Sequence, residues 1–296
     1  MSGMRIGFVG LGAMGAPMAR NLLAKSFAVR GFDTRMAAMD ELVTAGGERA
    51  ADAAAVAENA DALVLMVVNA AQAAAVLFDG GALDRLPEGA CVVLMATCPP
   101  GTVAALAERV EAAGRRFVDA PVSGGVVGAR GGTLTIMAAC PKPVFDGIRP
   151  VLAAMGDKVF LVGERAGQGA TVKTVNQLLC GVHIAVVAEA FALAEKVGVE
   201  LGVILEIMSG SAASSWMLKD RGPRMLEAEP EVTSAVDIFV KDLGIVLEAG
   251  REAKAALPLA AVAHQLFLAT SGRGEGAADD SQVIRTYALM NGTRRA

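Results

Sequence analysis

The sequence predicts an α/β domain with a doubly wound, mainly parallel sheet, followed by an all-α domain. In the first half, short apolar runs rich in β-branched residues alternate with alanine-rich stretches of helical period, which is the pattern of repeated βα units. Beyond residue 165 the chain is rich in Ala, Leu and Glu and offers no convincing strand. These two observations together predict two domains of different class.

Composition and charge favour a folded chain and exclude two classes of protein. Of the 296 residues, 54% are hydrophobic and 20% are charged. This apolar content can offset the entropy lost on folding, which excludes intrinsic disorder. The net charge of −4 gives no broad cationic surface for phosphate groups, so we expect no nucleic-acid partner. At about 150 residues per domain, the length also predicts two domains.

Cysteine and histidine usage argues against a disulfide scaffold and a metal centre. The four cysteines are scattered without a C-x-x-C pair, and there are only two histidines, which is typical of a protein in a reducing, cytoplasmic compartment. Asp279 and Asp280 are too few for a coordination shell, and we expect this segment to cap the final helix instead. No metal site is expected.

The sequence predicts neither a signal peptide nor a membrane span. The first strand begins within a few residues of Met1, which leaves no room for the charged and apolar regions of a signal peptide. Of two apolar stretches, residues 62–78 are interrupted by Asn69 and Gln72. The other, residues 178–188, is shorter than the roughly 20 residues needed to cross a bilayer. We therefore expect both to be buried elements of a protein without a membrane partner.

Strands are expected where the apolar runs are continuous, because the strands of a parallel sheet are covered on both faces. The expected strands are residues 5–9, 28–32, 63–68, 91–95, 116–118, 134–138 and 159–162. Helices are expected between them at residues 35–45, 51–58 and 102–113, and directly after the glycine-rich turn that follows the first strand. This order of elements predicts the doubly wound sheet.

The second domain is expected to begin with one long helix. Residues 168–196 contain no proline and only two glycines, and such a segment favours a single uninterrupted helix. The remaining chain is punctuated by glycine and proline, as in a series of shorter helices. We therefore place the boundary between residues 164 and 165, which gives domains 1–164 and 165–296.

A G-x-G-x-x-G motif joins the first strand to the first helix. It consists of Gly10, Leu11, Gly12, Ala13, Met14 and Gly15. In this context Gly10 would permit a tight turn, Gly12 would let the backbone approach a pyrophosphate, and Gly15 would let helix and strand pack closely. The helix N-terminus adds N–H groups for phosphate oxygens. The motif predicts a dinucleotide site on a Rossmann-type domain, and the alternative is a purely structural turn.

Asp33 predicts which dinucleotide binds. It ends the second expected strand, about 20 residues beyond the glycines, where an acidic side chain accepts a hydrogen bond from the ribose 2′-hydroxyl. A carboxylate at this point repels a 2′-phosphate, so the sequence favours NAD. Arg35 lies close enough in sequence to accommodate that phosphate, so NADP stays an alternative cofactor.

Later strand ends supply further candidates for cofactor contacts. Val68 and Asn69 close the 63–68 run, and Thr97 follows the 91–95 run. In an open α/β sheet these carboxyl ends face the ligand crevice. Thr97 could hydrogen-bond the nicotinamide ribose or the substrate, but a turn before Pro99 explains it equally well.

A serine and two glycines form a candidate binding loop. Ser123, Gly124 and Gly125 come shortly after the 116–118 strand. Such a segment exposes backbone N–H groups that can hold a carboxylate. A glycine-rich surface loop without a ligand is the alternative.

The long helix places three polar residues on one face. Lys173, Asn176 and Gln177 are spaced i, i+3, i+4 among apolar neighbours, so they lie side by side on the helix. An apolar setting disfavours the charged form of a lysine, which suits a group that must exchange a proton near neutral pH. The alternative is a lysine whose apolar stem lies on the helix while its amine reaches solvent.

Four segments, in this order, resemble the β-hydroxyacid dehydrogenase family. They are GFVGLGAMGAPMA at residues 7–19, DAPVSGGVVGARGG at 119–132, GQGATVKTVNQ at 167–177 and KDL at 241–243. The resemblance covers nearly the whole chain. It implies hydride transfer between a nicotinamide cofactor and a small carboxylate substrate, on a Rossmann-type domain joined by a long helix to a helical domain. It also implies a homodimer or homotetramer formed through the helical domain.

The resemblance implies a role for each matching residue. These roles are proton transfer for Lys173, binding of the substrate carboxylate for Ser123, Gly124 and Gly125, orientation of the substrate for Asn176 and Gln177, and contact with the cofactor for Thr97 and Lys241. Related reductases that act on imines lack the lysine, so Lys173 argues against that activity.

Further segments resemble the branch of the family that acts on four-carbon sugar acids such as L-threonate. They are VNAAQ at 68–72, GVHIA at 181–185, SWM at 215–217, SAVDIFVKDL at 234–243 and DDSQVI at 279–284. In that branch the polar pair after the lysine begins with histidine, whereas Asn176 matches the enzymes that reduce tartronate semialdehyde (2-hydroxy-3-oxopropionate). That reaction and the oxidation of 3-hydroxyisobutyrate therefore stay as alternatives, and a non-catalytic NAD-binding regulatory protein is a third.

Overall fold

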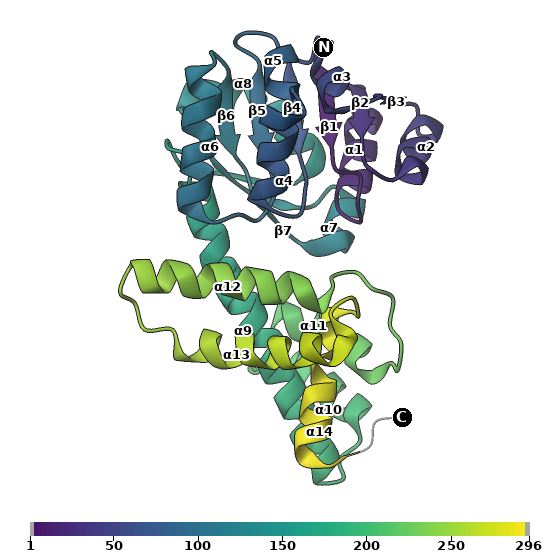
Figure 1. Cartoon of the computed structure of the whole chain (residues 1–296). Coiled ribbons are helices and arrows are strands. Elements are labelled where there is room, and N and C mark those ends of the chain that lie inside the picture. The colour runs from purple at the N-terminus through teal and green to yellow at the C-terminus, as the bar shows by residue number, and fades with distance from the viewer. Residues whose placement is uncertain (1–2, 294–296) are drawn as a thin grey trace. The chain divides into compact units, whose positions relative to one another are not determined.

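The computed structural model describes residues 3–293. The chain forms two compact units, Met1–Lys173 and Thr174–Ala296, each described here by itself (Figure 1). The division falls nine residues after the boundary expected between residues 164 and 165. The reason is that the start of the long helix α9 (Gln168–Lys196) packs on the first unit, where a Cβ at Gly169 would lie only 2.5 Å from the carbonyl oxygen of Met137.

The first unit is built on one mainly parallel sheet. In the described part of the chain its strands are β1 (Arg5–Val9), β2 (Ala28–Phe32), β3 (Glu48–Arg49), β4 (Ala62–Leu65), β5 (Cys91–Leu94), β6 (Arg116–Asp119), β7 (Val122–Ser123), β8 (Thr135–Ala139) and β9 (Lys158–Gly163). Their order is β3-β2-β1-β4-β5-β6-β8-β7, with β9 paired to β8. The pairs β6–β8 and β7–β8 are antiparallel. This is the predicted doubly wound sheet.

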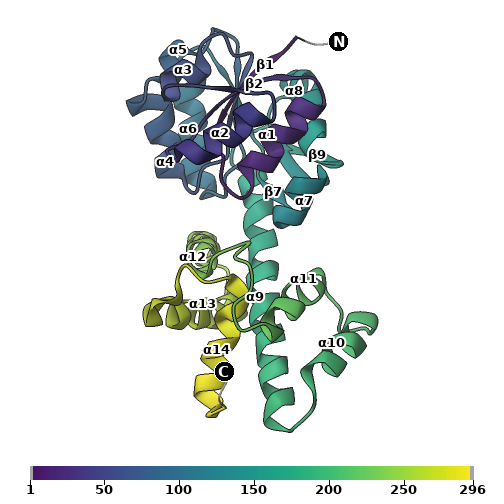
Figure 2. The same cartoon turned by 90° about the vertical axis from the view of Figure 1, so that its right-hand side faces the viewer.

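Helices cover the sheet on both faces because successive side chains of each strand point to opposite sides. Ile6 and Phe8 of β1 belong to a core shared with α1 (Gly15–Ala24), α2 (Met36–Thr44) and α8 (Lys142–Met155). Leu63 and Leu65 of β4 belong to the other core. That core lies under α3 (Ala53–Ala57), α4 (Ala70–Ala74) with its continuation η1 (Ala75–Asp79), α5 (Ala82–Arg85) and α6 (Pro100–Ala112). Figure 2 shows α4 and α6 on one side of the sheet and α1 and α8 on the other.

Two expectations about strands need correction. The run expected as strand 63–68 stops at Leu65, because the chain leaves the sheet there to enter α4. The strands β3 and β7 have two residues each. They were not expected, because an apolar run cannot be recognised in so short a segment.

The second unit is helical, as predicted. Besides α9 it contains α10 (Leu201–Gly210), α11 (Trp216–Leu226), α12 (Val236–Glu252), α13 (Pro258–Thr270), η2 (Ser271–Glu275), η3 (Asp280–Val283) and α14 (Ile284–Asn291). Phe191, Phe239 and Phe267 lie in its core, and the rings of the last two stack with centroids 5.2 Å apart. The β-type pairing recorded among the described residues of this unit is an isolated bridge between Ala235 and Asp279.

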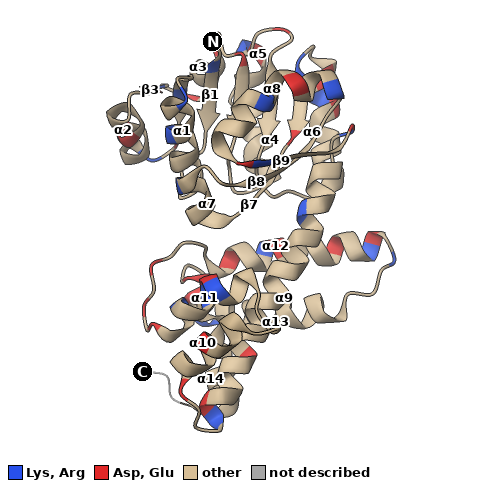
Figure 3. Ribbon diagram, turned by 180° about the vertical axis from the view of Figure 1, so that it is seen from behind, with Lys and Arg blue, Asp and Glu red and all other residues tan. Residues whose placement is uncertain are grey.

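A buried ionic cluster ties α11 to η3. Arg221 donates to both carboxylate oxygens of Asp280 at 2.9 and 2.8 Å, and Arg224 donates to Asp279 at 2.6 Å. Asp279 also accepts from the N–H of Ser281 and so caps η3, which runs directly into α14. Figure 3 shows basic and acidic residues close together at α11.

Helix α9 is the one helix in the described residues that is long and apolar enough to cross a membrane by length and composition. Half of its most apolar window is buried inside the structure. A core helix of a water-soluble protein meets the same test, so the helix gives only weak support for a membrane span.

Candidate active site

Most of the predicted site residues of the first unit lie where parallel strands end, while Ser123 lies in β7 and Lys173 on α9. Strands β1, β4, β5 and β6 are parallel neighbours in that order, so their carboxyl ends meet at the same edge. The chain leaves β1 toward β2 but later returns to β4 on the other side of β1. Such a switch point is where open α/β sheets bind their ligands.

The glycine motif has a geometry that only glycine accommodates at two of its three positions. Gly10 has φ +92°, and a Cβ there would lie 2.4 Å from the carbonyl oxygen of Met66. A Cβ on Gly15 would lie 1.8 Å from the carbonyl oxygen of Gly10. At Gly12, by contrast, the nearest atom is a guanidinium nitrogen of Arg35 at 4.0 Å. The backbone of Gly12 is therefore open to a close-approaching group, which fits a dinucleotide pyrophosphate.

Asp33 lies beside this loop and is already hydrogen-bonded to it. Its Oδ2 accepts from the N–H of Leu11 at 2.7 Å, and its Oδ1 accepts from the N–H of Arg35 at 2.9 Å. The Arg35 side chain donates to the same Oδ1 at 3.2 Å and to the Leu11 carbonyl at 3.0 Å. Burial opposes ionisation of Asp33, but these donors outweigh it and lower the pKa of the carboxyl. The carboxylate is thus ionised, with a guanidinium beside it.

Two further loop residues serve the local structure. The Oδ1 of Asn69 accepts from the N–H of Gln72 at 2.9 Å and caps α4, while Oε1 of Gln72 accepts from the N–H of Val68 at 2.9 Å. Val68 and Asn69 lie in the loop after β4 rather than in the strand. Thr97 is half-buried and lies between β5 and α6.

The loop expected to bind a carboxylate adopts an unusual backbone conformation. Ser123 pairs with Thr135 of β8. Gly124 and Gly125 then have φ +126° and +61°, values that favour glycine. They lead into α7 (Gly125–Gly131). The positive φ values explain why two glycines follow the serine.

Asp119 is a site residue that the sequence analysis did not single out. It ends β6 and is 1% exposed. Its Oδ2 accepts from the N–H groups of Gly167 and Ala170, both at 2.9 Å, at the start of α9. Burial raises the pKa of Asp119 to about 6, although the N–H groups of Ala170, Gly167 and Gly169 act in the opposite direction. The feature of the sequence that could have identified Asp119 was its position at the start of the DAPVSGG segment.

Lys173 follows on α9, three residues and slightly less than one turn after Ala170. Its side chain is buried, with 7% of the residue exposed, so the alternative of an amine reaching bulk solvent does not fit the structure. Asn176 and Gln177 come next on the same helix, and the Asn176 amide donates to Oε1 of Gln177 at 3.2 Å and to Sγ of Cys180 at 2.9 Å.

In the second unit, Gln177 belongs to a polar chain that ends on Lys241. The Gln177 amide donates to Oδ2 of Asp242 at 2.5 Å, and Oδ1 of Asp242 lies 2.8 Å from Nζ of Lys241. The second contact is an ion pair and not an aligned hydrogen bond. Asp242 is 2% exposed, so this buried carboxylate offsets the charge of Lys241. Asp242 lies within the KDL motif, but its role could not be inferred from the sequence alone.

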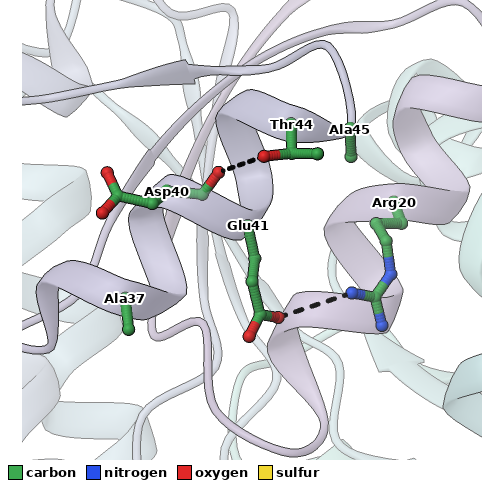
Figure 4. A pocket seen from close by; sticks show the side chains of 6 residues that line it. All are labelled: Arg20, Ala37, Asp40, Glu41, Thr44 and Ala45. Carbon is green, nitrogen blue, oxygen red and sulfur yellow. Dashed lines mark hydrogen bonds and ion pairs between the residues drawn. The ribbon is translucent and has the colours of Figure 1, made fainter.

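A surface hollow on the first unit is lined by other residues. It encloses about 540 Å³ between α1 and α2 and is lined by Arg20, Ala37, Asp40, Glu41, Thr44 and Ala45. The Arg20 guanidinium reaches Glu41 across it at 3.7 Å (Figure 4). None of these six residues belongs to the predicted site.

Two family models match the chain in succession. The NAD-binding domain of 6-phosphogluconate dehydrogenase matches residues 5–163, and the NAD-binding domain of NADP-dependent 3-hydroxyisobutyrate dehydrogenase matches residues 167–287. The chain is 43% identical over 283 residues to the L-threonate dehydrogenase of Cupriavidus necator, covering 95% of both proteins. The chain belongs to the β-hydroxyacid dehydrogenase family.

Other members of the family are similar over the same length. The 2-hydroxy-3-oxopropionate reductase of Escherichia coli is 32% identical to this dehydrogenase and aligns with 97% of it and 98% of its own chain. The solved 3-hydroxyisobutyrate dehydrogenase from Salmonella typhimurium superposes with a TM-score of 0.91 at 39% identity, covering 95% of this chain and 99% of its own. The protein is therefore an NAD(P)-dependent hydroxyacid dehydrogenase. This confirms the predicted fold class, family and cofactor class.

Proposed function

We propose that this dehydrogenase oxidises a four-carbon sugar acid such as L-threonate, with NAD as cofactor and Lys173 as the group that accepts the hydroxyl proton. The observation that carries the proposal is the burial of Lys173, at the start of a helix that leaves the same sheet edge as the glycine motif. Similarity to L-threonate dehydrogenases supports the choice of substrate.

The first unit supplies the groups that would hold the cofactor. The open backbone at Gly12 and the N-terminus of α1 suit the pyrophosphate, and the ionised Asp33 suits the hydroxyls of the adenosine ribose. Thr97, Val68 and Asn69 are proposed to contact the nicotinamide half. When bound, NAD supplies the acceptor for hydride.

The remaining roles follow from the chemistry of an alcohol oxidation. Ser123 and the amides of Gly124 and Gly125 are proposed to bind the substrate carboxylate. Neutral Lys173 takes the hydroxyl proton as the carbonyl forms, and Asn176 hydrogen-bonds the reacting oxygen. In the reverse direction, Lys173 returns the proton to that oxygen. Burial helps Lys173 in this task, because it favours the neutral amine.

The buried chain on the second unit suggests how two further residues act. The bond from Gln177 to Asp242 fixes the amide of Gln177. Its carbonyl oxygen accepts from the Asn176 amide and keeps a second lone pair, which we propose accepts from a substrate hydroxyl. The ion pair with Asp242 fixes Lys241, which we propose as a cofactor contact.

One observation favours a second candidate substrate. Asn176 stands where the sugar-acid branch is expected to carry histidine, and a 2-hydroxy-3-oxopropionate reductase is 32% identical to this chain. Reduction of tartronate semialdehyde is therefore the alternative reaction, and oxidation of 3-hydroxyisobutyrate is the next.

Initial rates of NADH formation test the proposal. L-threonate, D-threonate, D-glycerate, 3-hydroxyisobutyrate and 4-hydroxybutyrate are compared at saturating NAD, with K173M as the inactive control. We expect the highest kcat/KM with L-threonate. A higher value with D-glycerate or 3-hydroxyisobutyrate would overturn the substrate assignment. Tight NAD binding with no turnover of any acid would instead indicate a regulatory protein.

We also propose a homodimer or homotetramer formed through the helical unit. Leu179, Val186 and Leu193 are all more than half exposed and follow one another at seven-residue intervals on α9, so they form one apolar stripe. Light scattering should show a mass of at least twice 30.1 kDa, and V186E, which places a charge in the stripe, should lower that mass. A monomeric wild-type protein would contradict this assembly.

We also propose a reducing, cytoplasmic location, which the four free cysteines support.

A further inference from the structure

We propose that Asp119 is a positioning residue that fixes the start of α9 and thereby holds Lys173 where proton transfer occurs. This inference rests on the proposed role of Lys173. It assigns a task in the reaction to a carboxylate that lies on a different element, strand β6.

The side chain of Asp119 accepts hydrogen bonds where α9 begins. Its Oδ2 receives the N–H groups of Gly167 and Ala170 at 2.9 Å each. These are N–H groups of the kind that a helix terminus leaves without a partner inside the helix. Asp119 therefore acts as a cap supplied from another part of the chain.

The first turn of α9 also packs closely against neighbouring backbone. A Cβ on Gly169 would lie 2.8 Å from the carbonyl oxygen of Asp119, and a Cβ on Gly167 would lie 2.9 Å from the carbonyl oxygen of Pro100. At both points the backbone of this turn lies directly against the backbone of another segment. The side chain of Asp119 then fixes the turn by hydrogen bonds, while the glycines allow it to lie directly on the strand ends.

Charge gives a second reason for an aspartate at this position. The first turn of α9 contains no acidic residue of its own, and a helix N-terminus is stabilised by a nearby negative charge. The ionised form is nevertheless disfavoured by burial, which raises the pKa of Asp119 to about 6. If Asp119 served stability alone, an uncharged residue would be more favourable at this buried position. The carboxylate is better explained by the position in which it holds the first turn of α9.

Lys173 lies three residues after Ala170, which corresponds to about 4.5 Å along the helix axis. Any displacement of the first turn is therefore carried to Lys173 almost undiminished. A misplacement of about 1 Å at a reacting group can lower the rate about 100-fold. The expected consequence is a loss in kcat without a loss in cofactor affinity, because the glycine motif is on a different loop.

The experiment compares D119A and D119N with K173M and with D52A. Asp52 caps α3 in the same unit by accepting from the N–H of Ala55 at 2.7 Å, so D52A removes a helix cap that has no part in the proposed site. For each variant, kcat and KM are measured with the fastest hydroxy acid of the panel. The Kd for NAD is measured by calorimetry, and Tm by circular dichroism.

We expect D119A to lower kcat about 100-fold and D119N, which retains one acceptor oxygen, to recover about tenfold of that loss. The Kd for NAD should stay within about twofold of wild type, and the Tm of D119N should not fall, since asparagine carries no buried charge. D52A should lower Tm by about 2–4 °C and leave kcat unchanged.

The results that overturn the inference differ from those that overturn the proposed function. Values of kcat within twofold of wild type for D119N, with K173M inactive, would show that Asp119 has no positioning role. A loss of kcat in D119N that is matched by equal losses in Tm and in NAD affinity would show a merely structural role. Full activity of K173M would instead disprove the proposed function. If D119A does not fold, D119N alone decides.

Discussion

The three glycines of the G-x-G-x-x-G motif should respond differently to the same substitution. At Gly12 a Cβ would have its nearest neighbour, a guanidinium nitrogen of Arg35, at 4.0 Å. The change G12A therefore fits the cofactor-free protein, and its effect on the free energy of unfolding should stay within about 0.5 kcal/mol. The new methyl group occupies the space through which the backbone would meet the pyrophosphate, so NAD binding should weaken at least about tenfold, or about 1.4 kcal/mol.

The other two positions provide matched controls. G10A places a residue at φ +92° with its Cβ 2.4 Å from a carbonyl oxygen, and G15A places a Cβ 1.8 Å from one. Backbone strain of about 1–3 kcal/mol and overpacking of about 1–3 kcal/mol should lower Tm by several degrees in each.

Thermal unfolding and isothermal calorimetry with NAD separate the two effects. Wild-type affinity for NAD in G12A would refute the assignment of this loop to the pyrophosphate. An unchanged Tm in G15A would refute the close packing of strand and helix on which the argument rests.

Three further results are expected. R35A removes the guanidinium beside the ribose site, so the ratio of kcat/KM for NAD to that for NADP should rise about 5- to 10-fold; an unchanged ratio would exclude Arg35 from cofactor selection. For Asp119, whose pKa is raised to about 6, the contribution to stability is present below its unfolded pKa of about 3.9 and is lost as the pH rises through about 6. The stability of D119N relative to wild type should therefore increase between pH 4 and pH 7.5, by up to about 3 kcal/mol, and a difference independent of pH would contradict the raised pKa. R221A leaves Asp280 buried without its bidentate partner and should cost about 3–5 kcal/mol in urea unfolding. R251A, which breaks an exposed pair with Glu248, should cost less than about 1 kcal/mol.

Most of the sheet could be predicted because its strands are buried on both faces. Ile6 and Phe8 face one core while Leu63 and Leu65 face the other, and such runs stay apolar without alternation. The long helix α9 was predicted with its observed bounds, since no proline interrupts it. The strand end at Leu65 was missed, because the apolar residues that follow it belong to the loop before α4.

The candidate site could be predicted only where the local structure of the chain requires a particular residue type. Gly10 and Gly124 are required by positive φ, and Asp33 by its strand end. Asp119 and Asp242 were missed, because their partners lie 48 and 65 positions away in the chain. No spacing rule within a helix or strand reveals a hydrogen bond of that range.

Single-turnover hydride transfer with K173M tests the central claim most directly. The variant and the wild type are loaded with saturating NAD and mixed with the preferred hydroxy acid, and NADH formation is followed by absorbance. Removal of the proton acceptor should slow the step by about 10²–10⁴-fold, with the Kd for NAD within about twofold of wild type. A rate within threefold of wild type would show that Lys173 does not transfer the proton.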